Sequence, residues 1–139
     1  MKKRITLNEA VKFHGHLGPY LVLGVLAGEL AVKRLKSRKY FGLDVKVWGA
    51  NKKPKSCLID GLQLSTGATY GKGNIKKFPA TDIKVIVSDE NSNKKIILKL
   101  KEGIIRKIEE ASSHRDSEVL AKKIFFSKTG EFFNLTSRT

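Results

Sequence analysis

The residues best suited to chemistry are two histidines, His14 and His16, in a Phe-His-Gly-His-Leu-Gly-Pro-Tyr segment just before the most apolar stretch of the chain. Side chains at positions i and i+2 point to the same side of an extended segment but lie roughly 200° apart around a helix. The pair can therefore converge on one ion only if it precedes the helix. Gly15 loosens the backbone between the histidines, and Pro19 suits the first helical position.

The single cysteine, Cys57, is the thiol that could join the two imidazoles. Ser56 is the predicted N-cap of a helix from Cys57 to about Thr66, and the helix N-terminus together with neighbouring lysines favours a thiolate. Two imidazoles and one thiolate make three protein ligands, the number typical of a catalytic zinc site with a fourth position open. Zinc, or another divalent transition metal, suits these ligands.

Asp60 lies one turn beyond Cys57 on the same helical face. It could be a fourth ligand, an acceptor for an imidazole N–H, or a general base, and we name it as the candidate catalytic residue. An open metal position would permit Lewis-acid chemistry on a carbonyl or formyl group, whereas a thiolate ligand leaves electron-transfer roles open. Whether the chain is an enzyme stays undecided at this point.

A second candidate is the Gly-Lys-Gly-Asn segment at 71–74. Its residues Lys72, Gly73 and Asn74 resemble an anion-binding nest that could hold an anionic group of a substrate or of a pterin-like cofactor. A tight turn is the alternative, and the spacing excludes a Walker loop. The histidine pair and the cysteine also have structural alternatives, as hydrogen-bonded core rings and as a small buried side chain. His114 is interpreted as a solvated helix boundary.

Charge is the strongest compositional signal: 28 Lys and Arg against 13 Asp and Glu give a formal net charge of +15. Such a field attracts nucleic acid, an anionic cofactor or an acidic protein, so a basic nucleic-acid-binding module is the competing function. The basic residues are spread along the chain, and the sequence shows neither a recognition motif nor the exposed aromatic pairs of single-strand binders. We therefore rank nucleic acid below a metal-linked function.

Length and cysteine content predict one cytoplasmic domain spanning residues 1–139. One cysteine excludes an internal disulfide and a self-contained four-thiolate zinc finger, and fits a reduced compartment. The basic start is not followed by the apolar region of a signal peptide. The apolar run from Tyr20 to Val32 is broken by Glu29 and falls short of the ~20 residues that span a bilayer, so no membrane contact is expected.

Hydrophobic periodicity predicts an α+β fold with a small, mostly antiparallel sheet, a buried central helix and C-terminal helices. The helix from Pro19 to about Leu35 is apolar nearly all round at its start, as expected for a helix surrounded by protein. Gly24 and Gly28 lie on one face of it and would let another element approach closely. The other predicted elements are a short helix through Lys12, strands at 44–48, 83–87 and 96–100, and helices from 104 to about 111 and from about 116.

Two segments together resemble the FmdE family, which takes its name from formylmethanofuran dehydrogenase: residues 13–20 followed by a helix with Gly24 and Gly28, and residues 57–63 followed by Thr66 to Asn74. The resemblance implies an α+β core domain, often homodimeric. It also implies a metal site at the positions of His14, His16 and Cys57, with Asp60 close by.

The chain departs from the family pattern in two ways. Gly18 stands where many members carry a cysteine, and the C-terminal zinc ribbon of many members cannot occur in a chain with one cysteine. The family is associated with a larger oxidoreductase that reduces carbon dioxide onto methanofuran and whose molybdenum or tungsten pterin lies on a different polypeptide. The resemblance therefore implies an accessory or catalytic role in one-carbon, molybdopterin-linked metabolism, without assigning that reaction to this chain.

Overall fold

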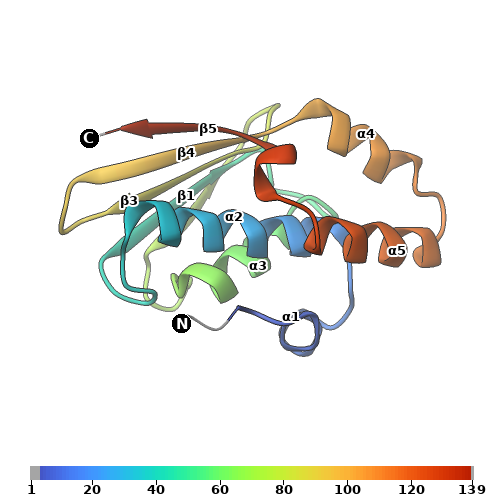
Figure 1. Cartoon of the computed structure of the whole chain (residues 1–139), viewed down its shortest axis with the longest axis horizontal. Helices are drawn as coiled ribbons and strands as arrows, with labels where there is room; N and C mark the ends of the chain where they lie inside the picture. The colour runs from blue at the N-terminus through green and yellow to red at the C-terminus, as the bar shows by residue number, and fades with distance from the viewer. Residues whose placement is uncertain (1–3, 139) are drawn as a thin grey trace.

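The computed structural model describes residues 4–138, in which five α-helices and one 3-10 helix combine with a five-stranded sheet. The α+β prediction is confirmed (Figure 1). In chain order the elements are α1 (Leu7–His14), α2 (Pro19–Leu35), β1 (Leu43–Trp48), α3 (Cys57–Thr66), β2 (Ile75–Phe78), β3 (Lys84–Asp89), β4 (Lys94–Leu100), α4 (Glu102–Glu110), α5 (His114–Phe125), η1 (Thr129–Glu131) and β5 (Phe133–Arg138).

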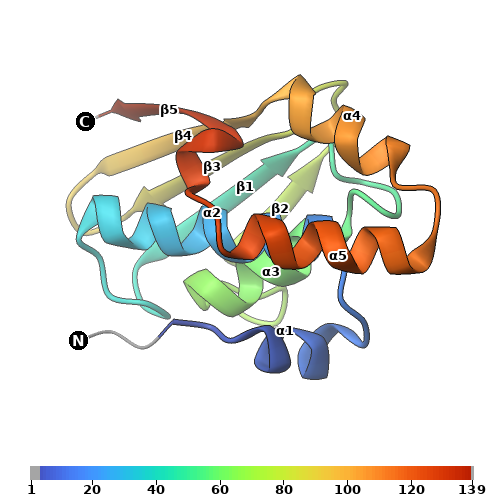
Figure 2. The ribbon, with the colours of Figure 1, turned by 45° about the vertical axis from the view of Figure 1, so that its right-hand side comes forward.

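The strands are arranged in the order β2-β1-β3-β4-β5, and only the β1–β2 pair is parallel. Helices α1, α2, α3 and α5 lie on one side of the sheet, and α4 lies beyond one end of the strands (Figures 1 and 2). The strands alternate buried and more exposed residues, as in β3, because one face packs on the helices. The predicted mostly antiparallel sheet is confirmed.

Helix α2 is the predicted buried central helix, and residues Leu21 to Leu23 have no exposed surface. It packs against α3 through small residues: a Cβ on Gly24 would overlap the carbonyl oxygen of Leu58, and one on Gly61 would overlap the carbonyl oxygen of Leu21. The predicted close approach at Gly24 is therefore confirmed. Side chains of ordinary size at these positions would force the two helices apart.

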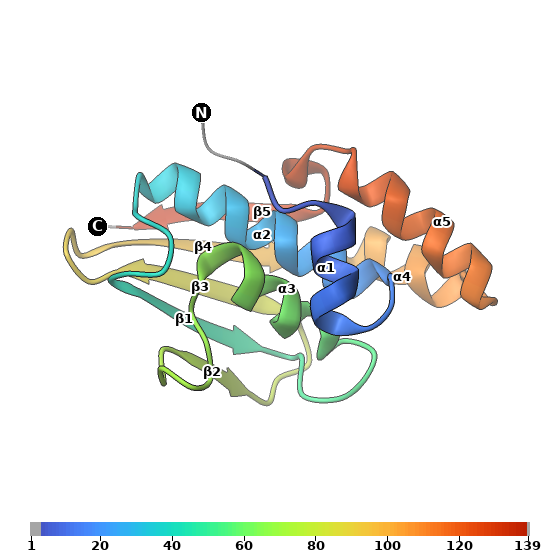
Figure 3. The ribbon, with the colours of Figure 1, turned by 90° about the horizontal axis from the view of Figure 1, so that it is seen from below.

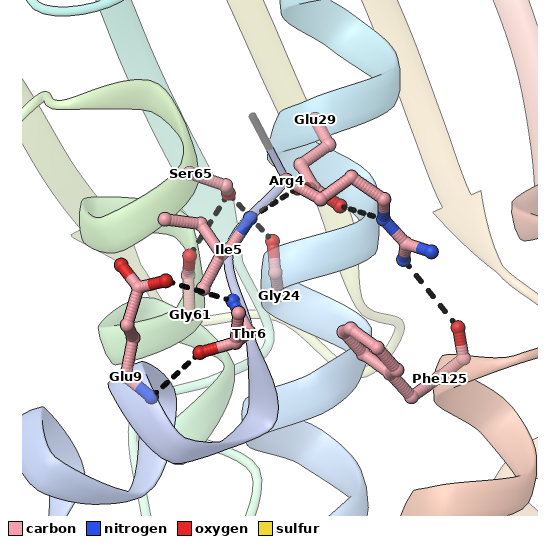
Figure 4. A network of polar contacts seen from close by, with 9 residues as sticks. All are labelled: Arg4, Ile5, Thr6, Glu9, Gly24, Glu29, Gly61, Ser65 and Phe125. Carbon is pink, nitrogen blue, oxygen red and sulfur yellow. Dashed lines mark hydrogen bonds and ion pairs between the residues drawn. The ribbon is translucent and has the colours of Figure 1, made fainter. Parts of the chain in front are cut away.

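Polar contacts lock this helix pair and the segment before α1 (Figure 4). The Ser65 hydroxyl lies 3.2 Å from the carbonyl oxygen of Gly24 in α2 and 2.9 Å from that of Gly61 in α3. The backbone N–H of Ile5 donates to Glu29 of α2 at 3.0 Å, and Thr6 caps α1, one of the two caps the sequence predicts. Helix α1 is thereby held beside the start of α3, as Figure 3 shows.

Three boundaries differ from the sequence-based predictions. Helix α1 continues to His14 rather than ending at Lys12, and strands β2 and β5 were not predicted. Both strands lie at the edges of the sheet, where half of the residues face solvent and polar side chains dilute the hydrophobic alternation. Backbone pairing with β1 and β4, which is nonlocal, makes these segments strands.

Within the described residues, no single helix has both the length and the apolar composition needed to cross a bilayer. Helices α1 and α2 meet that test only when joined, and they are bent by 119° relative to each other.

Candidate metal centre

The end of helix α1 brings the two histidines together. His14 is the last residue of α1, and Gly15 follows in a left-handed conformation, φ 106°, with its N–H donating to the carbonyl oxygen of Val11 at 2.7 Å. The chain reverses there, so that His16 folds back beside His14 with the ring centroids 4.6 Å apart. Both residues precede α2, as the spacing predicts, but a helix end rather than an extended segment makes them converge.

Cys57 completes the cluster from the first residue of α3. One nitrogen from each of His14 and His16 and the Cys57 sulfur all lie within 4.8 Å of one another. Ligand atoms around a tetrahedral zinc ion at ordinary bond lengths lie roughly 3.3 to 3.8 Å apart. The three side chains are therefore close enough to contact one ion after small adjustments.

His14 has the environment expected of a metal ligand. Its Nδ1 lies 2.6 Å from Oδ2 of Asp60; the carboxylate accepts, so Nδ1 carries the proton and Nε2 keeps its lone pair. The side chain is 11% exposed, and Nε2 is buried without a hydrogen-bond partner in residues 4–138. Leaving such an atom unpaired costs about 1–3 kcal/mol, which a bound cation would offset.

A chain of hydrogen bonds connects this histidine to the loop after α3. The second carboxylate oxygen of Asp60 accepts from Nε2 of Gln63 at 3.3 Å, and Oε1 of Gln63 accepts from the backbone N–H of Tyr70 at 3.2 Å. These bonds hold the Asp60 carboxylate toward His14. They also join the two regions that the sequence singled out, the histidine pair and the loop at 69–74.

Residues 72–74 close a turn in that loop. Lys72 donates from Nζ to the Tyr40 carbonyl oxygen at 3.1 Å, and Gly73 has a positive φ of 75°. The Asn74 amide is engaged at both ends, accepting from the Thr69 N–H and donating to the Leu43 carbonyl oxygen. The turn predicted as the alternative is therefore formed, with Lys72 and Asn74 tying it to the segment before β1.

The ionisation of the cluster differs from the sequence-based expectation. Burial, followed by the Asp60 carboxylate, raises the pKa of the Cys57 thiol, although Lys53 acts in the opposite direction. Ser56 is itself helical and makes no side-chain capping bond, so the predicted N-cap is wrong. Partial burial, followed by the neighbouring His14 and His114, lowers the pKa of His16. Before an ion binds, the predicted thiolate is thus disfavoured while His16 is kept neutral.

His114 is the neighbour that sequence reasoning missed. Its ring centroid lies 6.3 Å from that of His16, and its Nε2 lies 2.9 Å from Oε1 of Glu118 one turn along α5. No local pattern indicates this, because almost a hundred residues separate it from His16 and only the packing of α5 against α2 brings it near. It places a third imidazole at the rim of the cluster.

Comparison with known proteins places these features in a family. A family model described as "FmdE, Molybdenum formylmethanofuran dehydrogenase operon" matches residues 13–131. The crystal structure of an FmdE-like protein of tungsten formylmethanofuran dehydrogenase, from Syntrophus aciditrophicus, aligns with a TM-score of 0.67 at 23% identity, covering 100% of this chain and 77% of that one. At that identity, the similarity supports the fold alone.

A curated relative, a probable S-adenosyl-L-methionine-binding protein from Archaeoglobus fulgidus, is 33% identical over 73 residues. The match covers 50% of this chain and 19% of the relative, so the chain spans less than a fifth of that protein's length.

Proposed function

Since the chain belongs to the FmdE family, whose model matches residues 13–131, we propose that it is a metal-binding protein with His14, His16 and Cys57 as the ligands. The observation that carries the proposal is the buried, unpartnered Nε2 of His14, oriented by the Asp60 carboxylate on the other ring nitrogen. Imidazole ligands that bind metals usually donate their second N–H to such an acceptor. We propose zinc because imidazole and thiolate together suit it.

In this proposal each side chain has a separate task. Asp60 holds His14 in the tautomer that points Nε2 into the cluster, and it is near enough to take up a proton from a group bound there. His16 supplies a neutral nitrogen, and Cys57 supplies the charge that anchors a cation. When bound, the metal contributes Lewis-acid polarisation of a carbonyl or formyl group.

The loop at 69–74 extends the proposal to a substrate. Lys72 and the positive-φ turn at Gly73 and Asn74 are connected to Asp60 through Gln63 and Tyr70, and we propose that they receive the anionic group of a substrate or pterin-like cofactor. The family's name associates it with formylmethanofuran dehydrogenase. An accessory or catalytic role in such a cytoplasmic complex, as a homodimer, completes the proposal, and sedimentation analysis tests the dimer.

Elemental analysis of protein purified without a histidine tag tests the metal. We expect about one transition-metal ion per chain, lost in the double variant His14→Ala, His16→Ala, because three ligands would fall to one. His114→Ala is the matched control: it also removes an imidazole near the cluster, and it should keep the ion. Metal-free native protein, or equal content in the double variant, contradicts the proposal.

Two further variants separate a structural from a catalytic metal. Cys57→Ser should lower the thermal stability if the ion only stabilises the fold, but leave the fold intact if the ion serves chemistry. Asp60→Asn replaces the charged acceptor by a neutral amide and should weaken metal affinity by about 10- to 100-fold, as seen for partners of ligating histidines. An unchanged affinity in Asp60→Asn would remove the carboxylate from the proposed site.

A further inference from the structure

The face of the sheet turned away from the helices carries an ordered set of side chains. Along β1, Leu43, Val45 and Val47 are buried, so the alternate residues point to the other face. Strand register aligns those alternate residues in three rows, which we call the open sheet face: Phe78, Trp48, Lys84, Lys99 and Asn134; Lys76, Lys46, Ile86, Ile97 and Thr136; Asp44, Ser88, Lys95 and Arg138. In the described part of the chain no helix covers it (Figures 1 and 3).

Charge on the open sheet face is almost entirely of one sign. Asp44 is its only acid, and within residues 4–138 none of its cations takes part in an ion pair shorter than 4 Å. The six cations are Lys46, Lys76, Lys84, Lys95, Lys99 and Arg138. Cations spaced over a flat surface at strand separations of about 5 Å can follow the phosphates of an extended polyanion.

Aromatic rings lie among these cations. The parallel pairing of β1 with β2 stacks Trp48 on Phe78, with ring centroids 5.0 Å apart and planes inclined by 24°. Lys84 Nζ lies 4.5 Å from the centroid of the Trp48 ring. Both rings are partly exposed, and Ile86 and Ile97 form an apolar centre in the adjoining row. This is an aromatic pair of the kind that the sequence alone did not reveal.

From these observations we propose that the open sheet face binds single-stranded nucleic acid. Bases stack on the Trp48–Phe78 pair and on the isoleucine centre, and the surrounding lysines contact phosphates. Single-strand binders combine aromatic platforms with a basic surface in this way, and open sheets serve as such platforms. The proposal is independent of the metal centre, which lies among the helices on the opposite side of the sheet.

The charge distribution argues against other occupants. A second copy packed face to face would oppose six cations with six cations, which costs energy at every row. An acidic protein matches the charge but does not use the stacked rings. A single strand supplies both negative charge and flat apolar rings, and for this reason it is the occupant we choose.

Trp48 makes the test direct, because it is the only tryptophan of the chain. Titration with a dodecamer of thymidylate should quench its fluorescence as bases stack, whereas heparin and polyglutamate, which carry charge but no bases, should not. Affinity should fall with salt by roughly 0.7 log units per log unit of salt for each phosphate contact. If the dodecamer leaves the fluorescence unchanged, or polyglutamate binds as tightly as the dodecamer, the proposal is overturned.

Paired charge reversals locate the surface. The double variants Lys46→Glu, Lys99→Glu on the open sheet face and Lys122→Glu, Lys123→Glu on α5 lower the net charge by the same amount, and the α5 pair is exposed on the other side of the sheet. We expect at least about tenfold weaker dodecamer binding for the first, with a shallower salt slope, and a change under about threefold for the second. Equal losses would mean a diffuse basic surface and would overturn the assignment.

A third variant separates stacking from charge. Phe78→Ala removes one ring without changing the charge and should weaken dodecamer binding by about fivefold or more. Circular dichroism confirms that the variants are folded. Unchanged binding in folded Phe78→Ala, or a protein dimer that Lys46→Glu, Lys99→Glu dissociates, would refute the stacking platform and assign the face to another partner.

Discussion

His14 is constrained on both sides of its ring, by the Asp60 carboxylate at Nδ1 and by burial without a partner at Nε2. The other two members of the cluster differ in how ready they are to bind a cation. The pKa of His16 is lowered, so its ring is neutral near pH 7, whereas the pKa of the Cys57 thiol is raised, so it remains protonated there. Cys57 is therefore the ligand that must release a proton when an ion binds.

Metal affinity should accordingly increase with pH. Below the raised thiol pKa each ion that binds displaces one proton, so the affinity is expected to rise about tenfold per pH unit between about pH 6 and 8. His16 adds to this slope only at lower pH, because its pKa is lowered. Competition with a chromophoric chelator measures the slope. Cys57→Ser should show a flat profile in this range, and a flat profile in the native protein would mean that the thiol is not a ligand.

At the scale of elements, the closeness of α2 and α3 positions the cluster. Gly24 and Gly61 let the two backbones touch, and Ser65 bridges their carbonyl groups. Cys57 begins α3 and Leu58, which meets Gly24, is its neighbour in the chain. The distance between α2 and α3 therefore determines where the thiol lies relative to the histidines.

Gly24→Ala should destabilise the fold by about 2–3 kcal/mol, because its methyl group would overlap the carbonyl oxygen of Leu58, a backbone atom that cannot rotate away. The matched control is Gly103→Ala in α4, where an added Cβ meets no atom within 4 Å. That control should stabilise by about 0.5–1 kcal/mol through helix propensity. Urea unfolding measures both, and a Gly24→Ala protein as stable as the native chain would contradict the close helix contact.

At the scale of the whole molecule, the excess of 28 basic over 13 acidic residues opposes folding through self-repulsion. The few ion pairs of the described residues, Arg4 with Glu29 and two that involve histidine, compensate little of it. The helical side holds the metal cluster, and the sheet side holds the open sheet face, so one small domain presents two separate surfaces.

Salt should therefore stabilise this protein. Screening shortens the reach of the repulsion from about 30 Å at 0.01 M to about 8 Å at 0.15 M ionic strength, and the Tm is expected to rise by a few degrees over that interval. Lys122→Glu, Lys123→Glu lowers the net charge by four and should show a smaller rise. Differential scanning calorimetry checks this, and a Tm that falls with salt would show that attractive pairs dominate.

The sequence by itself determined the local features of this protein. Alternation in β1 and β3, the apolar run of α2, Gly67 as the end of α3 and the small residue at Gly24 all express preferences of a residue and its near neighbours. The family could be recognised for the same reason, since its two motifs are each contiguous in the chain.

Only the tertiary structure decided which distant groups meet. Strands β2 and β5 form by pairing with partners elsewhere in the chain, His114 reaches His16 through the docking of α5, and Trp48 meets Phe78 by parallel pairing across 30 positions. Burial, which raises the pKa of Cys57 and leaves Nε2 of His14 without a partner, is likewise a property of the packed chain. Local propensity cannot encode these contacts, because their energies depend on solvent exclusion by segments far apart in the sequence.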